Sequence, residues 1–249
     1  MQPQFPTVSM LWIEGRLSTL EELSIHSFLQ CGHGVDLHTY DPGLAVPAGV
    51  RLCDANEIIP ADQRFRSSTV IGRGSWGPFS DLFRFTLLQQ RGGIWCDLDL
   101  VCLKPLDFVA DRTYFASEYA SPKESARALA TTCFIAAPPG EPLINECLRR
   151  TTAIGRHQKK WADSGPGAVR AVIAETGRLD CVLQPDIFCC VPHWEIHQLI
   201  SGFRLIKPAA YGLHFWNEVW RWNFLDKNMT YDSLSIYERL KKHYLKPVH

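Results

Sequence analysis

The sequence predicts an α/β fold: a single domain in which an open sheet is flanked by helices. β-rich segments alternate with amphipathic helical segments from the N-terminus onward, the order typical of open α/β sheets. The 249 residues, 46% of them hydrophobic, are enough for one large core. No internal repeat, low-complexity run or shift in composition marks a boundary, so residues 1–249 are taken as one domain with a helical tail from 222 to 249.

The N-terminal third predicts a strand, a helix and two further strands. Ser18 and Glu21 have the spacing of a capping box, which places a helix start at Ser18. The predicted elements are a strand at 8–13, a helix at 18–30, and strands at 35–40 and 50–52.

Residues 80–103 are the most informative stretch. Ser80 is predicted to cap a helix that ends at Gly92 and Gly93, and residues 94–103 then read as one buried strand. In that strand Asp97 and Asp99 would share a face, roughly 6–7 Å apart. Two buried carboxylates are costly unless a cation compensates them or the strand end opens to water. The pair therefore predicts a hard-cation site or a functional carboxylate pair, with two solvated carboxylates as the alternative.

The second half of the chain predicts further strands and helices. Strands are expected at 113–117 and 132–137, and helices at 142–154, 168–176 and 231–244. The loop 164–167 enters a helix N-terminus, where backbone N–H groups can bind an anion.

Two motifs suggest other functions. Gly72, Gly74 and Gly77 satisfy G-x-G-x-x-G after the β-like residues 69–71, which is the layout of a dinucleotide site and supports an NAD-dependent oxidoreductase as an alternative. A glycine-rich flexible loop beside the site is the other interpretation. The segment 193–197, HWEIH, lacks a glutamate directly after its first histidine, so it is interpreted as surface structure and not as a zinc-protease helix.

The segment 211–222 contains three tryptophans. Flat aromatic faces suit sugar rings and nucleobases, although core packing is the alternative for at least two of the three. Trp216 is a candidate donor contact, and a non-catalytic sugar-binding module is a further hypothesis for the chain. His214 is either a buried, hydrogen-bonded imidazole or a metal ligand.

Composition excludes several classes. A formal charge of zero argues against a nucleic-acid binder. The nine cysteines include no CxxC, which argues against zinc and against a disulfide framework, and favours reduced thiols in a cytoplasmic setting. No signal peptide and no membrane span are expected. The basic tail (Lys241, Lys242, His243, Lys246) is either solvated or in weak peripheral contact with the inner face of a membrane.

Several collinear stretches between Val8 and Trp222 resemble glycosyltransferase family 32, which is distantly similar to the large glucosylating toxins. SD-x-x-R followed by GG-I-x-x-D-x-D is the specific part of the resemblance. The stretches are LWIEG, SFLQCGHGVDLHTYD, DANEI, FSDLFRFTLLQQRGGIWCDLDLVCLKPLD, SGPGAV and GLHFWNEVWRW.

The resemblance implies a GT-A type, Rossmann-like open mixed sheet, a nucleotide-sugar donor, Mn²⁺ or Mg²⁺, and retention at the anomeric carbon. A UDP-sugar is favoured over a GDP-sugar. It further implies a catalytic set of Asp81, Arg84 and Asp97, and a metal set of Asp97, Asp99 and His214, with Asp99 as the direct ligand. The implied donor contacts are Trp12 at the nucleobase, Asp81, Arg84 and Asp97 at the sugar and phosphates, and Gly165, Pro166 and Trp216.

The resulting expectation is a hexosyltransferase of polysaccharide or capsule biosynthesis that acts on a glycan or lipid-linked glycan. A protein acceptor is the alternative, as for the toxins. No further carboxylate in the sequence is placed well enough to be a nucleophile, so same-face displacement and a covalent intermediate both stay open.

Overall fold

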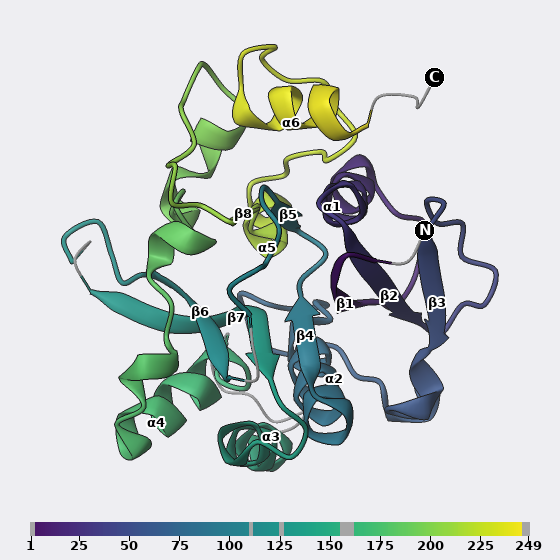
Figure 1. The fold of residues 1–249 in the computed structure, drawn as a ribbon, viewed down its shortest axis with the longest axis vertical. Coiled ribbons are helices and arrows are strands. Elements are labelled where there is room, and N and C mark those ends of the chain that lie inside the picture. The colour runs from purple at the N-terminus through teal and green to yellow at the C-terminus, as the bar shows by residue number, and fades with distance from the viewer. Residues whose placement is uncertain (1–2, 110–111, 125–126, 155–161, 246–249) are drawn as a thin grey trace.

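The computed structural model describes residues 3–109, 112–124, 127–154 and 162–245, which form one α/β domain around a mixed sheet (Figure 1). The sheet has six strands in the order β3-β2-β1-β4-β7-β6. The first four in that order are parallel, and β7 and β6 add an antiparallel edge. The strands are β1 (Phe5–Trp12), β2 (His33–Thr39), β3 (Val50–Asp54), β4 (Gly93–Cys96), β6 (Tyr114–Tyr119) and β7 (Ala128–Ala137). The predicted fold class is confirmed.

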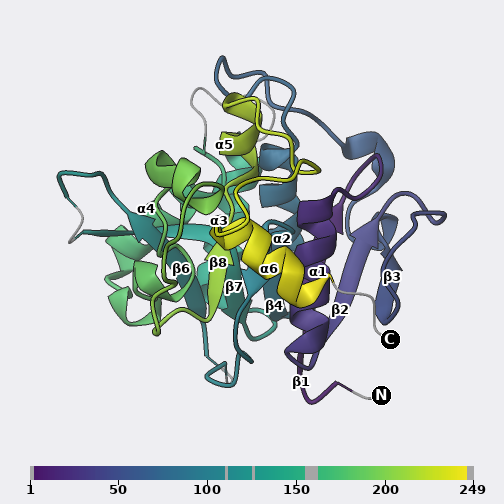
Figure 2. The same ribbon diagram turned by 90° about the horizontal axis from the view of Figure 1, so that it is seen from above.

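Two layers cover the sheet (Figures 1 and 2). One hydrophobic cluster includes α1, α6 and a small antiparallel pair, β5 (Leu100–Cys102) with β8 (Gly212–His214). A second cluster includes α2, α3 and α4 on the opposite face. The helices are α1 (Thr19–Gln30), α2 (Gly77–Arg91), α3 (Pro142–Ile154), α4 (Pro166–Thr176), α5 (Asn217–Trp222) and α6 (Ile236–Tyr244).

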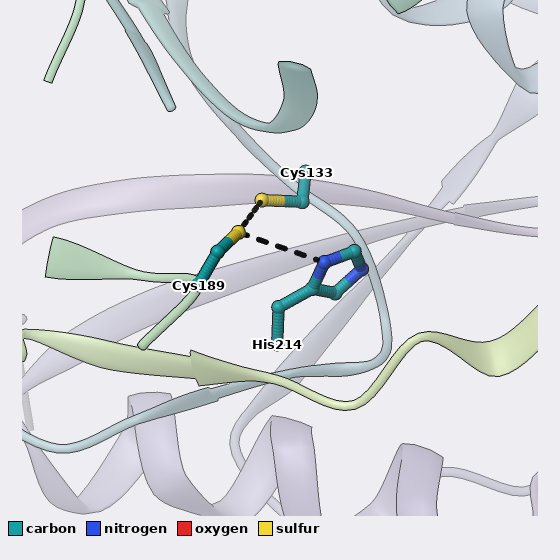
Figure 3. A group of neighbouring side chains, drawn as sticks. All are labelled: Cys133, Cys189 and His214. Atoms are coloured by element: carbon teal, nitrogen blue, oxygen red, sulfur yellow. Dashed lines mark hydrogen bonds between the residues drawn. The ribbon is translucent and has the colours of Figure 1, made fainter. Parts of the chain in front are cut away.

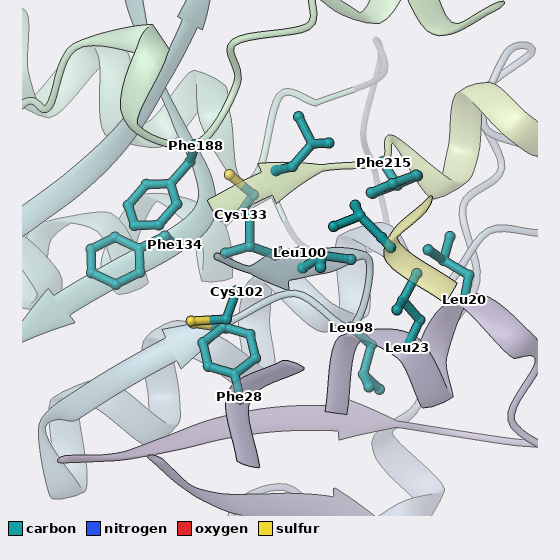
Figure 4. Packing of buried hydrophobic residues seen from close by; sticks show 14 of the residues in the cluster. Leu20, Leu23, Phe28, Leu98, Leu100, Cys102, Cys133, Phe134, Phe188 and Phe215 are labelled. Carbon is teal, nitrogen blue, oxygen red and sulfur yellow. The ribbon is translucent and has the colours of Figure 1, made fainter. Parts of the chain in front are cut away.

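The hydrophobic core beside β5 and β8 holds the loop around residue 188 and strand β7 against each other. Phe134 of β7 stacks on Phe188 with ring centroids 4.4 Å apart, and Cys133 and Leu100 lie next to them (Figure 4). Burying one phenylalanine contributes about 2–3 kcal/mol. This packing anchors the loop around residue 188 to the central sheet.

The capping box at the start of α1 is confirmed. The Ser18 side chain accepts from Leu20 N, and the Glu21 carboxylate accepts from Ser18 N at 2.9 Å. The prediction that Gly92 ends α2 also holds, because Gly92 takes φ 62°, a backbone region that glycine tolerates.

The predicted N-cap at Ser80 is wrong. Helix α2 begins at Gly77 and has Pro78 in its first turn, where the missing N–H has no cost. Ser80 therefore lies inside the helix, and its Oγ accepts from Arg84 Nη2 at 3.0 Å.

The predicted single strand at 94–103 is also wrong. β4 ends at Cys96, residues 97–99 form a turn closed by Leu100 N donating to Asp97 O at 3.0 Å, and β5 then pairs with β8 in the second sheet. The two aspartates lie in a turn that joins two sheets, which follows from long-range pairing that the local pattern does not encode.

Residues 69–71 do not form a strand, contrary to the expectation for a dinucleotide site. Val70 and Ile71 are 88% and 62% exposed, in a turn. A Rossmann site needs a buried strand feeding the glycine turn. The geometry thus argues against the oxidoreductase alternative, while Gly74 and Gly77 lie beside the cavity described below.

The C-terminal segment is docked on the domain. Helix α6 is shorter than predicted, starts after Ser235, and packs beside α1, where Gln30 Nε2 donates to Tyr244 O at 2.7 Å (Figure 2). Lys241 is paired with Glu238 at 2.6 Å, which leaves less free positive charge than the sequence predicts, and Lys246 lies outside the described residues. Among the described helices, none combines the length and apolar character that crossing a bilayer requires.

Candidate active site

A cavity of about 600 Å³ opens at the carboxyl ends of β1 and β4. Ligands bind at this edge in open α/β sheets because loops and helix N-termini converge there. Trp12 at the end of β1, the turn after β4, the first turns of α2 and the β8–α5 junction all line it.

Asp97 follows β4 directly and is held by two donors. Trp95 Nε1 and Arg84 Nη1 each lie 2.8 Å from Asp97 Oδ1. Burial raises the pKa of Asp97, and the Arg84 charge opposes that shift. Both donors are on Oδ1, so Oδ2 is the oxygen less used by the protein.

Arg84 is buried beneath the site and bonded on every side. Nη1 also donates to Thr132 O at 2.6 Å, Nη2 lies 3.4 Å from Asp81 Oδ1, and the guanidinium stands 5.0 Å from the Trp95 ring centroid. The resemblance implied that Arg84 offsets phosphate charge directly. In the structure, the nearest anionic partners of Arg84 are Asp97 and Asp81. Arg84 therefore positions these two carboxylates directly, and would act on the donor phosphates only through them.

Asp81 lies one helical turn before Arg84 and faces the loop that enters α4. Ser164 Oγ donates to Asp81 Oδ2 at 2.8 Å. A Cβ on Gly165 would lie 2.1 Å from Asp81 Oδ1, so only glycine permits this approach. Burial raises the pKa of Asp81, while Arg84 and Ser164 act to lower it.

Asp99, in the turn before β5, and His214, in β8, face each other. His214 Nε2 lies 3.3 Å from Asp99 Oδ2, which also accepts from Asn217 N at 2.6 Å. Burial opposes ionisation of both groups. Their mutual attraction prevails: the pKa of Asp99 lies below its ordinary value and that of His214 well above.

Asp97, Asp99 and His214 each offer one ligand atom, and these atoms lie within 4.8 Å of one another. The tertiary structure therefore brings together the three residues of the expected metal set. Two carboxylates and an imidazole form a donor set that suits Mn²⁺ and, through its oxygens, Mg²⁺. The residues present fit such a cation.

The expected donor contacts also surround the cavity. Trp12 and Pro166 line it directly, whereas Gly165 lies behind Asp81. Trp216 lines it as well, with its ring 4.1 Å from that of His214 and its backbone at φ 56°, ψ 57°. A left-handed conformation costs a bulky residue roughly 1–2 kcal/mol, and such strain clusters at functional sites.

Sequence reasoning missed several charged residues that line the cavity. Three arginines are each paired with a cavity-lining glutamate: Arg66 with Glu14, Arg170 with Glu118, and Arg221 with Glu218. Only the last pair lies in a segment that the sequence singled out. Glu14 lies in the LWIEG stretch, whereas Arg66, Glu118 and Arg170 are isolated charges without a motif that no local signal could have found.

His193 is a further residue that was missed. The segment 193–197 was interpreted as surface structure, and it forms part of a 3₁₀ helix (His193–Leu199), which agrees with the exclusion of a zinc-protease helix. His193 nevertheless lines the cavity, with Nδ1 3.7 Å from Glu118 Oε2.

Comparison with known proteins gives a matching protein family and solved structures of similar fold. Residues 64–159 match the family model of capsular polysaccharide synthesis proteins. The solved structure of the PaToxG glycosyltransferase superposes with a TM-score of 0.51 at 19% identity, over 70% of each chain. The apo glycosyltransferase GlyE from Streptococcus pneumoniae gives a TM-score of 0.43 at 12% identity, over 97% of this chain and 63% of that one. None of the curated proteins compared matches significantly.

The family match indicates a glycosyltransferase, and the likeness to PaToxG shows the fold. The predicted resemblance is confirmed at this level, and so is the prediction of a transferase. The matched segment contains Asp81, Arg84, Asp97 and Asp99. A glycosyltransferase takes in general a nucleotide-sugar donor and a glycan acceptor.

Proposed function

We propose that the protein transfers a hexose or N-acetylhexosamine from a nucleotide-sugar donor to a glycan or lipid-linked glycan in capsule or polysaccharide synthesis, with retention at the anomeric carbon. Mn²⁺ or Mg²⁺ is required, and a UDP-sugar is preferred to a GDP-sugar. The observation that carries the proposal is the convergence of Asp97, Asp99 and His214, with ligand atoms within 4.8 Å, on the wall of a cavity of about 600 Å³. A cavity of this volume has the size of small-molecule sites.

Asp97, Asp99 and His214 would hold the cation. When bound, it supplies positive charge that neutralises the donor diphosphate and stabilises the leaving group.

The protein contributes a fixed arrangement of carboxylates. Arg84 holds Asp97 from one side while Trp95 holds it from another, and Asn217 N fixes Asp99. Side chains locked in this way cost little reorganisation when charge develops in the reaction. Asp81, which accepts from Ser164 Oγ, would accept a hydrogen bond from a hydroxyl of the donor sugar.

The aromatic wall suits the rest of the donor. Trp12 lines the cavity at the end of β1, and its Nε1 donates to Gly15 O at 2.8 Å, which fixes the ring. An immobilised indole offers a flat apolar face for a nucleobase without further loss of side-chain entropy. We assign Trp12 to the base and Trp216 to the donor sugar.

The test is a panel of nucleotide sugars incubated with the protein and Mn²⁺, with release of free nucleotide as the readout. We expect release from at least one UDP-sugar, loss of release with a chelator, and recovery when Mn²⁺ is restored. No release from any donor, in the presence of a glycan acceptor, would contradict the proposal. NAD is the matched control in a thermal shift assay, where UDP with Mn²⁺ is expected to raise the melting temperature and NAD is not.

A further inference from the structure

A second group of potential ligands lies beside the carboxylate turn, on the far side of the same histidine. Cys133 of β7, Cys189 in the loop after Phe188 and His214 of β8 converge from three separate segments (Figure 3). Their relative exposures are 1%, 0% and 7%. Cys189 Sγ lies 3.8 Å from Cys133 Sγ and 3.9 Å from His214 Nδ1, and all three atoms lie within 4.8 Å of one another.

We propose that Cys133, Cys189 and His214 form a binding site for a soft divalent cation, represented by Zn²⁺. Tetrahedral Zn²⁺ takes sulfur at about 2.3 Å and imidazole nitrogen at about 2.0 Å, so neighbouring ligand atoms lie about 3.5–3.8 Å apart. The two measured separations are within a few tenths of an ångström of that range. Thiolate and imidazole ligands select Zn²⁺ over Mg²⁺ and Mn²⁺.

The orientation of the His214 ring supports the site independently. Its Nε2 faces Asp99 Oδ2 at 3.3 Å, and Asp99 is itself fixed by Asn217 N at 2.6 Å. Metal-binding histidines are commonly oriented in this way, with the second ring nitrogen donating to a carboxylate. Nδ1 therefore faces the two sulfurs before any cation is present.

Access to this site is through the cavity. Cys133 and His214 line the cavity, whereas Cys189 closes the group from behind. A fourth coordination position can thus be taken by water from the cavity side. Binding forms two Zn–S bonds and one Zn–N bond. The two thiols and Nδ1 of the protonated His214 ring release their protons to solvent, Nε2 keeps its own, and no oxidation state changes.

Zinc at this site should also weaken Mn²⁺ binding at the carboxylate turn. This consequence, unlike zinc binding itself, rests on the proposed function. While Nδ1 is bound to Zn²⁺, Nε2 carries the proton that it donates to Asp99 and is no longer a ligand for Mn²⁺. Occupation by Zn²⁺ is then expected to raise the Mn²⁺ concentration needed for half-maximal nucleotide release. Zinc binding itself requires no donor and no transfer.

The experiment is a Co²⁺ titration of the full metal-free chain in the presence of a phosphine reductant, followed by displacement with Zn²⁺. Thiolate-to-cobalt charge-transfer bands are expected at one equivalent and should vanish on adding Zn²⁺. Cys189→Ser is expected to lower Zn²⁺ affinity at least about 10-fold and to remove most of the charge-transfer intensity. Cys190→Ser is the matched control, since Cys190 is adjacent and 3% exposed but outside the group, and it should bind Zn²⁺ as the unchanged protein does.

A measurement on the unchanged protein tests the site even if the Cys189→Ser variant does not fold. X-ray absorption of the Zn²⁺-loaded chain should give two sulfur ligands and one histidine nitrogen, and a shell of oxygen and nitrogen alone would overturn the inference. Equal Zn²⁺ affinity in the Cys189→Ser and Cys190→Ser variants would overturn it too. Nucleotide release with Mn²⁺ by a protein that binds no Zn²⁺ would leave the proposed function standing, so the two failures are distinguishable.

Discussion

Arg84 and Asp97 form a largely buried ion pair with Nη1 2.8 Å from Oδ1, which ties the start of α2 to the turn that follows β4. Their side chains are 5% and 23% exposed, so water screens the pair weakly. The Arg84 guanidinium also lies 3.4 Å from Asp81, so its single positive charge compensates two carboxylates from different segments. The position of the proposed donor site depends on this contact.

Replacing Arg84 by methionine should destabilise the fold. Buried Asp81 and largely buried Asp97 would lose their compensating charge, a change that costs about 3–5 kcal/mol. The free energy of unfolding in urea measures the effect. Arg178→Met is the control, because the Arg178–Asp180 pair is exposed and its loss should leave the free energy of unfolding almost unchanged.

The double variant Arg84→Met with Asp97→Asn separates charge compensation from packing. If the pair is coupled, the second substitution should recover about 1–3 kcal/mol of the loss. Strict additivity of the two single effects would show that Arg84 stabilises the protein by packing on Trp95 and not by holding Asp97.

Asp99→Asn should reduce Mn²⁺-dependent nucleotide release by roughly 10²–10³-fold. It should also lower the melting temperature, because buried His214 loses its carboxylate partner. The amide oxygen still accepts from Asn217 N, so the local fold is kept, but the negative charge that would hold the cation is lost. The rate of nucleotide release from a UDP-sugar is the measurement. Asp180→Asn, on an exposed residue, should release nucleotide at the unchanged rate. Full activity in the Asp99 variant would remove this residue from the proposed site.

Gly165→Ala should raise the KM for the donor and lower stability by about 1–3 kcal/mol, because its Cβ would collide with Asp81. The nearest Asp81 oxygen would be only 2.1 Å away, so the carboxylate must move. Donor titrations and urea unfolding check the two effects. Gly43→Ala provides the comparison, since its Cβ would meet Asp41 at an ordinary 3.4 Å, and equal effects of the two substitutions would argue against the close approach.

The free energy of unfolding should fall as the pH is lowered, and His38 accounts for part of this fall. Burial lowers the pKa of His38 to about 4, and its Nδ1 has no hydrogen-bond partner among the residues that the structure describes. The unfolded chain takes up this proton below its ordinary pKa of about 6.5, whereas the folded protein takes it up only near pH 4. Stability due to neutral His38 is therefore present above about pH 6.5 and is lost as the pH falls toward 4.

His38→Leu should remove that part of the pH dependence. Relative to the unchanged protein, the variant should gain about 2 kcal/mol in free energy of unfolding between pH 7 and pH 4.5. Urea unfolding at several pH values measures the difference in free energy of unfolding between the two proteins. The other titratable groups are the same in both, so their contributions cancel in this difference. A constant difference between the two proteins over this range would contradict the shifted pKa.

Much of the local structure could be predicted because its causes lie within a few residues. The capping box at Ser18 and the glycine that ends α2 each act over one helical turn, and both are present in the structure. The start of α2 was misplaced at Ser80 because the first helical turn contains a glycine and a proline, which sequence rules read as loop.

The sequence by itself determined the fold class, the presence of an Asp-x-Asp pair in a buried apolar stretch, and the one-turn spacing of Asp81 and Arg84. Only the tertiary structure decided that Asp97 and Asp99 lie in a turn between two sheets, and that Asn217, 118 positions away, fixes Asp99. The same holds for Cys133 and Cys189, which are 56 positions apart and have no motif spacing. The physical reason is that helix caps and side-chain periodicity depend on neighbours along the chain. Strand pairing and side-chain convergence depend instead on which distant segments bury their apolar faces together.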